Sequence, residues 1–152
     1  MALKENELRP IIENIEKNYN NIEEPLIEKV LQRLYSFGYT LKEDDSWMIA
    51  FCTQIVEKQI KNSCNILEIP DGLTEVTVDR ICGEFLFSKK QSGKLDNEFD
   101  IEMAVKQVQT GDTNITFYVE GTETTEVRLN KLITYLKTKG EGDLICYRKM
   151  SW

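Results

Sequence analysis

Three consecutive carboxylates, Glu43, Asp44 and Asp45, are the residues whose types and spacing come closest to an acid–base centre. Paired carboxyl groups act as general acid and general base when their surroundings separate their pKa values. These three, however, directly precede Ser46 and a long apolar segment, so they stand where a helix begins. The helix dipole stabilises negative charge at that end. We therefore expect them to start a helix rather than to catalyse a reaction.

The chain has few residues suited to nucleophilic catalysis or to metal binding. The chain has no histidine, which removes the commonest general base and excludes Ser/His and Cys/His pairs. No CxxC spacing occurs among the four cysteines Cys52, Cys64, Cys82 and Cys146, so no zinc site is expected. Four acidic residues alternate over 96–102, but they lack the glycine and glutamate that complete a calcium loop. The sequence predicts no enzyme, metal or cofactor.

Length and charge limit the function classes further. The chain has 152 residues and a net charge of −7, so we expect one domain, residues 1–152, that nucleic-acid phosphates repel overall. The acidic balance fits either simple solubility or a surface that DNA slides past. No apolar run reaches the length of a membrane span, and MALKENELRP has no apolar signal core. Neither membrane insertion nor export is indicated.

Apolar residues at helical spacing predict the elements that must position any site. Helices are expected over about 8–19, 24–38, 44–63, 73–90 and 129–136. The fold class is therefore mainly α: a small bundle of about four to five helices. In the first half of the 44–63 helix, apolar residues such as Trp47 and Phe51 cover nearly the whole circumference. Such a helix belongs in the middle of a bundle or in an interface. Gly83 is expected to allow close packing against this helix.

A β-hairpin is predicted as an insert at about 101–120. Ile101, Met103 and Val105 alternate with polar residues, as do Ile115, Phe117 and Val119, and the intervening 110–113 fits a turn. An isolated pair of strands is marginal in water. The hairpin is therefore expected either to cover the helical core of its own subunit or to lie along a neighbouring copy.

The C-terminal residues, about 143–152, are predicted to form an extended tail after the GEGD sequence ends the last helix. Arg148 and Lys149 lie between Tyr147 and Trp152. Interleaved basic and aromatic residues can grip single strands of nucleic acid. Docking on a partner protein is the alternative that we favour, since Trp, Tyr and Arg are enriched among interface anchors.

Several short stretches occur in an order that resembles a known family. They are N-x-L-x-I-P-x-G-L at 65–73, CGEFLFSKKQSG at 82–93, V-K-x-V-x-x-G-D-T-N at 105–114 and the ending GEGDLICYRKMSW at 140–152. Together they resemble the head–tail connector (adaptor) proteins of long-tailed bacteriophages. The likeness is to the clostridial-type branch found in phages, prophages and phage-tail-like particles.

The resemblance implies a structural protein of the virion neck, assembled in the bacterial host cytoplasm. Its subunits would form a homo-oligomeric ring, usually a dodecamer, that docks under the portal protein and contacts the next neck or tail-terminator protein. DNA would pass through the lumen without specific recognition. Candidate interface residues are Val105, Val108, Ile115 and Phe117 in the hairpin, and Leu144, Tyr147, Arg148 and Trp152 in the tail. The alternatives are the collar of a headless phage-tail-like bacteriocin and a small nucleic-acid-binding regulator of a prophage.

Overall fold

Helices build the architecture of this chain, in a computed structural model that describes residues 5–19, 22–93, 95, 99–111 and 125–149. The α-helices of these ranges are α1 (Glu5–Asn18), α2 (Glu24–Ser36), α3 (Ser46–Cys64), α4 (Thr74–Gln91), α5 (Ile101–Gly111), α6 (Thr125–Thr138) and α7 (Glu141–Tyr147). Short 3-10 helices, η1 (Glu43–Asp45) and η2 (Asp71–Leu73), lead into α3 and α4. The mainly helical fold class is confirmed.

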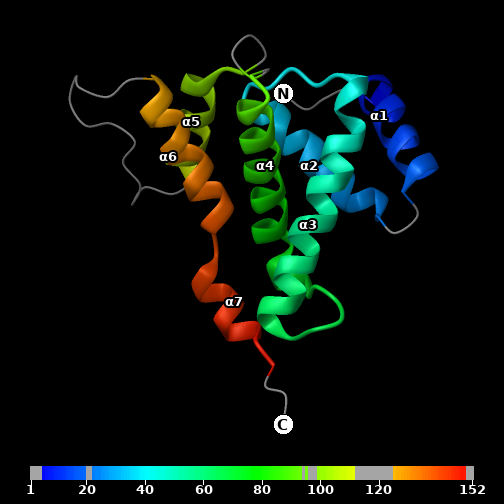
Figure 1. Cartoon of the computed structure of the whole chain (residues 1–152), viewed down its shortest axis with the longest axis vertical. Helices are drawn as coiled ribbons and strands as arrows, with labels where there is room; N and C mark the ends of the chain where they lie inside the picture. Colours follow the sequence, from blue (N-terminus) through cyan, green and yellow to red (C-terminus); the bar gives the residue numbers. More distant parts are fainter. Residues whose placement is uncertain (1–4, 20–21, 94, 96–98, 112–124, 150–152) are drawn as a thin grey trace.

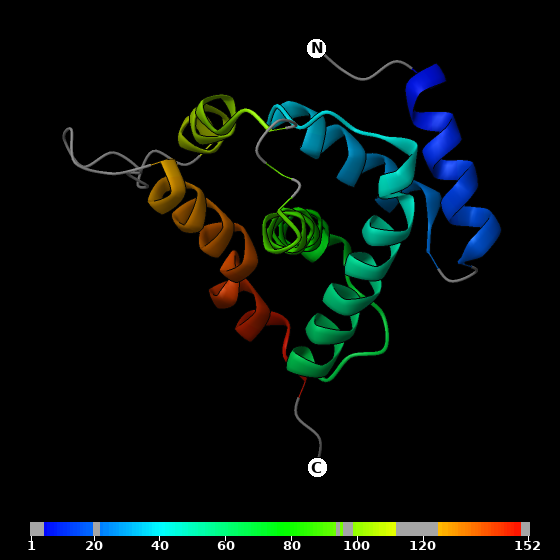
Figure 2. The same ribbon diagram turned by 45° about the horizontal axis from the view of Figure 1, so that its top comes forward.

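Helix α4 lies at the centre of the bundle. Figure 2 shows it almost end-on, with α2, α3, α5 and α6 arranged around it. Its buried residues are distributed around the helix and include Val78, Ile81 and Phe85, so neighbours can pack on several sides. The buried apolar side chains form one cluster that extends from Leu8 in α1 to Leu144 in α7.

The predicted helices at 8–19, 24–38, 44–63, 73–90 and 129–136 correspond to α1, α2, α3, α4 and α6, with ends shifted by a few residues. Gly83 allows a close approach, but to α6 instead of α3. A methyl group at Gly83 would lie 2.9 Å from Leu136 Cβ and 2.9 Å from the Lys137 amide nitrogen. This glycine therefore lets α4 and α6 pack closely together.

The predicted hairpin strand at 101–109 is wrong, because this segment is α5. The Asp100 carboxylate accepts a hydrogen bond of 3.2 Å from the Met103 amide, as a helix N-cap does. Ala104, Val105 and Val108 are buried on one helical stripe. That stripe covers the core of its own subunit. A strand could not cover it in this way, because the consecutive side chains of Ala104 and Val105 would point to opposite faces. The other predicted strand, with Ile115, Phe117 and Val119, lies outside the described residues.

The prediction of an extended tail over 143–152 is wrong for its first part, because α7 occupies Glu141–Tyr147. Gly140, which was expected to end the preceding helix, has a φ of +77° and turns the chain directly into α7. A side chain at Gly140 would collide with Val76 of α4. With α5 and α7 included, the predicted number of four to five helices is too low.

Candidate functional site

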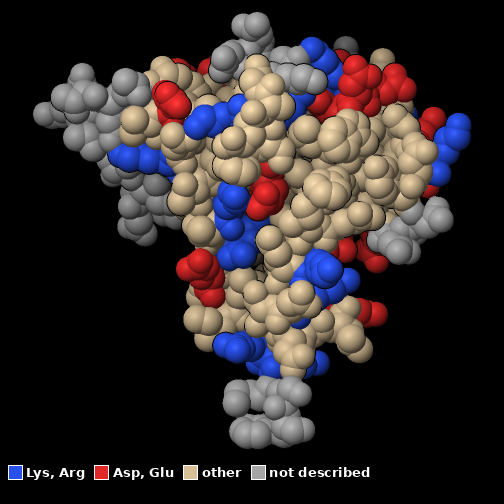
Figure 3. All heavy atoms as spheres, viewed as in Figure 1, with Lys and Arg blue, Asp and Glu red and all other residues tan. Residues whose placement is uncertain are grey.

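Helix α3 has one side that no described element covers. Its opposite side is buried through residues such as Ile49, Val56 and Ile60, yet Trp47 is 58% exposed and Phe51 is 52% exposed. Gln54 and Lys58 continue the same exposed row at helical spacing. We call Trp47, Phe51, Gln54 and Lys58 the outer face of α3. Figure 3 shows acidic side chains at the start of α3 and, below them, a surface without charged side chains over the rest of its upper half.

Burial of Asp45 fixes the start of this helix. Its carboxylate accepts hydrogen bonds from Lys89 Nζ at 2.9 Å, from the Tyr39 hydroxyl at 2.9 Å and from the Lys42 amide at 3.1 Å. The Lys89 ammonium also lies 5.9 Å and 6.0 Å from the ring centres of Tyr39 and Phe85. The network joins the segment before α3 to α4, so the position of Trp47, two residues after Asp45, is set by buried contacts.

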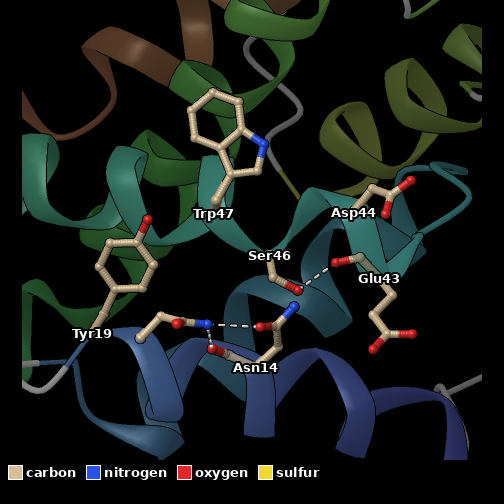
Figure 4. A pocket seen from close by; sticks show the side chains of 7 residues that line it. Asn14, Tyr19, Glu43, Asp44, Ser46 and Trp47 are labelled. Carbon is tan, nitrogen blue, oxygen red and sulfur yellow. Dashed lines mark hydrogen bonds between the residues drawn. The ribbon is translucent and has the colours of Figure 1, made fainter.

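Of the three predicted helix-starting carboxylates, only Asp45 is buried; Glu43 and Asp44 are exposed. They line a cavity of about 650 Å³ beside Trp47, together with Asn14, Asn18, Tyr19 and Ser46. Figure 4 shows that polar groups here bond to one another: Asn18 donates to Asn14 at 2.8 Å, and Ser46 donates to the Glu43 carbonyl at 2.6 Å. Within the described ranges, no group of three Cys, Asp or Glu side chains could hold a metal ion.

A second buried carboxylate, Asp79, also joins helices. It accepts a hydrogen bond of 2.9 Å from Arg33 Nε on α2 and forms an ion pair with Lys139, which follows α6. Arg33 also lies 4.6 Å from the centre of the Phe37 ring. A cavity of about 1180 Å³ opens beside this group between α2 and α4. Because both cations already contact the Asp79 carboxylate, the group serves to hold α2, α4 and the α6–α7 junction together.

The buried cysteines are poor nucleophiles at neutral pH. Burial raises the pKa of the Cys52 thiol to about 11 and raises the pKa of Cys82 well above its ordinary value. Both side chains lie between helices in the core. Cys52 Sγ is 4.0 Å from the Ser88 hydroxyl and Cys82 Sγ is 3.9 Å from the Val30 carbonyl.

The C-terminal end of the described chain forms a second exposed region, at α7. Ile145 is 71% exposed and Tyr147 is 40% exposed, and Arg148 is exposed beside them. After α7 the chain is held to the end of α3: the Lys149 amide donates to the Cys64 carbonyl at 2.7 Å, and Asn65 Nδ2 donates to the Lys149 carbonyl at 3.2 Å. We call Ile145, Tyr147 and Arg148 the α7 surface.

The predicted interface residues have different positions. Val105 and Val108 are each 2% exposed and pack in the core, so of the two alternatives for this segment, packing within the subunit describes them. Leu144 is also buried, and its carbonyl accepts a hydrogen bond from Cys64 Sγ at 3.4 Å. Tyr147 and Arg148 lie at the surface. Ile115, Phe117 and Trp152 lie outside the described residues.

The outer face of α3 was not among the predicted interface residues. The sequence signal was present, because the first half of this helix is apolar nearly all round, and the prediction for such a helix included an interface. Among the described residues, no helix combines the length and apolar character needed to cross a bilayer. Comparisons of the chain with protein-family models, with curated proteins and with solved structures find no match.

Proposed function

We propose that this protein is a ring-forming head–tail connector of a bacteriophage or phage-like particle, with no chemistry of its own. In this proposal, copies of the chain associate side by side into a ring, and the family resemblance implies twelve copies. The ring docks under the portal protein, contacts the next neck or tail-terminator protein and extends the DNA channel. The virion neck would be its location, after assembly in the host cytoplasm.

The observation that carries this proposal is the exposure of Trp47 and Phe51 on helix α3. Burying large aromatic side chains contributes strongly to association, and Trp and Tyr are enriched among interface anchors. A ring contact is heterologous, so one patch must fit a different patch on the neighbouring copy. The outer face of α3 and the α7 surface are two such patches, on different helices and at different places on the molecule.

The net charge of −7 also supports a channel protein that DNA crosses without being held. Each cationic contact with a phosphate releases counterions and strengthens binding to the backbone, so a strongly basic lumen would retain the DNA. An acidic chain avoids this retention.

The first experiment is imaging of native particles that contain the chain, together with native mass measurement of the purified protein. We expect a ring of this chain between capsid and tail. A ring on a tail that has no capsid would identify the headless alternative. A protein that is absent from particles, or present there as single isolated copies, would contradict the connector function.

The second experiment tests the α7 surface in particle assembly. Arg148→Glu is expected to leave the bundle folded, because Arg148 is exposed, but to yield unjoined heads and tails by electron microscopy. Leu67→Ser is the control, since Leu67 is 92% exposed in the loop between α3 and α4. Normal joining in the Arg148→Glu particles would remove the α7 surface from the docking role.

A further inference from the structure

The exposed row on α3 has the spacing of a contact between two packed helices. Its residues follow one another at intervals of three, four, three and four, and all are exposed: Asp44, Trp47, Phe51, Gln54 and Lys58. Asp44 lies in η1, a 3-10 helix in which residues three apart align, so it continues the row of α3. Intervals that alternate between three and four mark the seam along which two helices pack at a small crossing angle. The outer face of α3 can therefore accept another helix.

The row is symmetric about Phe51, except that the charges at its two ends are opposite. Asp44 is seven residues before Phe51, and Lys58 is seven residues after it. Trp47 is four residues before Phe51, and the half-buried Ile55 is four residues after it. Within the described ranges, neither the Asp44 carboxylate nor the Lys58 ammonium forms a salt bridge in its own subunit. Both charges can therefore pair with a second molecule.

The same face of a second copy, turned antiparallel, fits this pattern. A two-fold axis through Phe51 places Lys58 of each copy level with Asp44 of the other, both about 10 Å along the helix from the axis at 1.5 Å per residue. The same axis places Trp47 level with Ile55, so apolar side chains meet between the two charge pairs. A parallel arrangement would instead place like charges opposite each other. Figure 3 shows the same difference between the ends of α3, with acidic side chains at its start and basic ones over its second half.

We infer that the free protein forms a two-fold symmetric dimer in which the outer faces of two α3 helices pack antiparallel, with Phe51 at the axis and Asp44 of each copy beside Lys58 of the other. This contact is isologous, because both copies contribute the same patch. The inference goes beyond the ring proposed above, whose contacts are heterologous. A contact of a few helical turns is small, so we expect a dissociation constant of about 1–100 µM.

The dimer has a consequence for assembly, and this consequence alone rests on the proposed connector function. The ring contact proposed above uses Trp47 and Phe51, and the dimer covers the same two side chains. A subunit therefore enters a ring only after its dimer opens, which the weak association allows.

Charge variants of the full-length chain test the antiparallel pairing in sedimentation equilibrium. Asp44→Lys and Lys58→Asp each place like charges together at both ends of the contact, so each should weaken the dimer about 5- to 30-fold. The combined variant exchanges the charges and should restore the dimer to within about threefold. Glu68→Lys makes the same charge change at an exposed position between α3 and α4, and should alter dimerisation less than about twofold. A combined variant as weak as the single ones would contradict the pairing.

A mixture of the two single variants tests the same contact in a second way. When Asp44→Lys is mixed with ¹⁵N-labelled Lys58→Asp, each mixed dimer again has opposite charges at both ends. Native mass measurement should therefore find mixed dimers in excess over dimers of either variant. Equal tendencies to form all three species would contradict the pairing.

The fluorescence of Trp47 shows whether the dimer uses this face. In a chain that carries Trp152→Phe, Trp47 is the one remaining tryptophan. Its emission maximum should move to longer wavelength on dilution, over the concentrations at which the dimer dissociates, because the indole passes from an interface into water. Phe51→Ser removes the residue at the axis from both copies and should weaken the dimer about 30-fold or more. A dimer whose dissociation leaves the Trp47 emission unchanged uses another surface and overturns the inference.

The outcomes separate this inference from the proposed function. A free chain that stays monomeric up to about 1 mM, or that forms rings without passing through a dimer, would overturn the inference and leave the connector function standing. A dimer with the expected charge dependence, formed by a protein that is absent from particles, would overturn the connector function and leave the dimer standing.

Discussion

At the scale of single residues, the buried charges are the groups on which the arrangement of the helices depends most. Asp45 and Lys89 lie far apart in the sequence but form one buried pair, and the Tyr39 hydroxyl and Lys42 amide use the second carboxylate oxygen. A buried charge that loses its partner is strongly destabilising, because the low-dielectric interior replaces water poorly. The position of the α3 N-terminus therefore depends on the Asp45 side chain.

Asp45→Ala should lower the free energy of unfolding by about 3–5 kcal/mol, because it removes the carboxylate that accepts a hydrogen bond from the buried Lys89 ammonium. Urea denaturation followed by circular dichroism measures the change. Asp44→Ala is the matched control, since the neighbouring carboxylate is exposed, and it should change stability by about 0.5 kcal/mol or less. A loss below about 1 kcal/mol for Asp45→Ala would show that the pair contributes little to the fold.

At the scale of elements, the close contact of α4 with α6 determines how the C-terminal third of the chain joins the rest. Gly83 is buried at the crossing, and Lys137 of α6 forms an ion pair of 3.5 Å with Glu84 beside it. The Lys137 ammonium also lies 4.0 Å from the centre of the Phe87 ring. The small size of Gly83 therefore contributes more to stability, through close packing, than its low helix propensity costs.

Gly83→Ala should destabilise the protein by about 1–3 kcal/mol, because the added methyl group has no room against Leu136 and the α6 backbone. Gly142→Ala is the matched comparison within α7, where an added Cβ meets nothing within 4 Å. It should stabilise the chain by up to about 1 kcal/mol through helix propensity. Thermal unfolding of both variants measures these two changes in stability. Changes of equal size and the same sign would contradict the packing argument.

Helical periodicity in the sequence was enough to predict α1, α2, α3, α4 and α6, because each has a run of apolar residues at spacings of three and four. It failed for α5. Ile101, Met103 and Val105 fit a strand period, whereas the residues that the tertiary structure buries are Ala104, Val105 and Val108. A short segment satisfies both periods, and only packing against the rest of the molecule decides between them.

The candidate site was predictable only in part for a related reason. The sequence shows that α3 is apolar nearly all round, but not which of its sides the neighbouring helices leave uncovered. That depends on where α1 and α4 pack, and hence on contacts between distant residues such as Cys52 and Ser88. Tyr147 and Arg148 are exposed, but α7 is helical where an extended chain was expected.

At the scale of the whole molecule, the bundle is wide at the end where α1 and α3 begin and narrow at the end where α7 lies (Figure 1). Exposed acidic groups, including Glu43 and Asp44, belong to the wide end, and Arg148 and Lys149 belong to the narrow end. In Figure 3, negative side chains gather at the upper right, and positive ones are spread over the face, with a group at the bottom. The two ends of the molecule therefore differ in width and in their exposed residues. The proposed ring, which lies between two different partners, requires such a difference.

The overall negative charge predicts that the purified protein will not shift duplex DNA in a gel at about 0.1 M salt, because the phosphates repel it. Titration with DNA of mixed sequence, repeated at lower salt, is the measurement. The variant Arg148→Glu, which removes a basic residue at the narrow end, is the control. Like the wild type, it should not shift the DNA. A salt-dependent shift that Arg148→Glu abolishes would instead favour the nucleic-acid-binding alternative.

The hydrogen bonds that hold Lys149 to Cys64 and Asn65 have a practical consequence for microscopy. They fix Lys149, the last described residue, at the end of the molecule opposite the start of α1 (Figure 1). In the proposed ring, with the long axis of the subunit along the ring axis, a small fluorescent or electron-dense label fused after Trp152 and another fused before Met1 should mark opposite rims. Even coarse images would then reveal which rim points toward the genome.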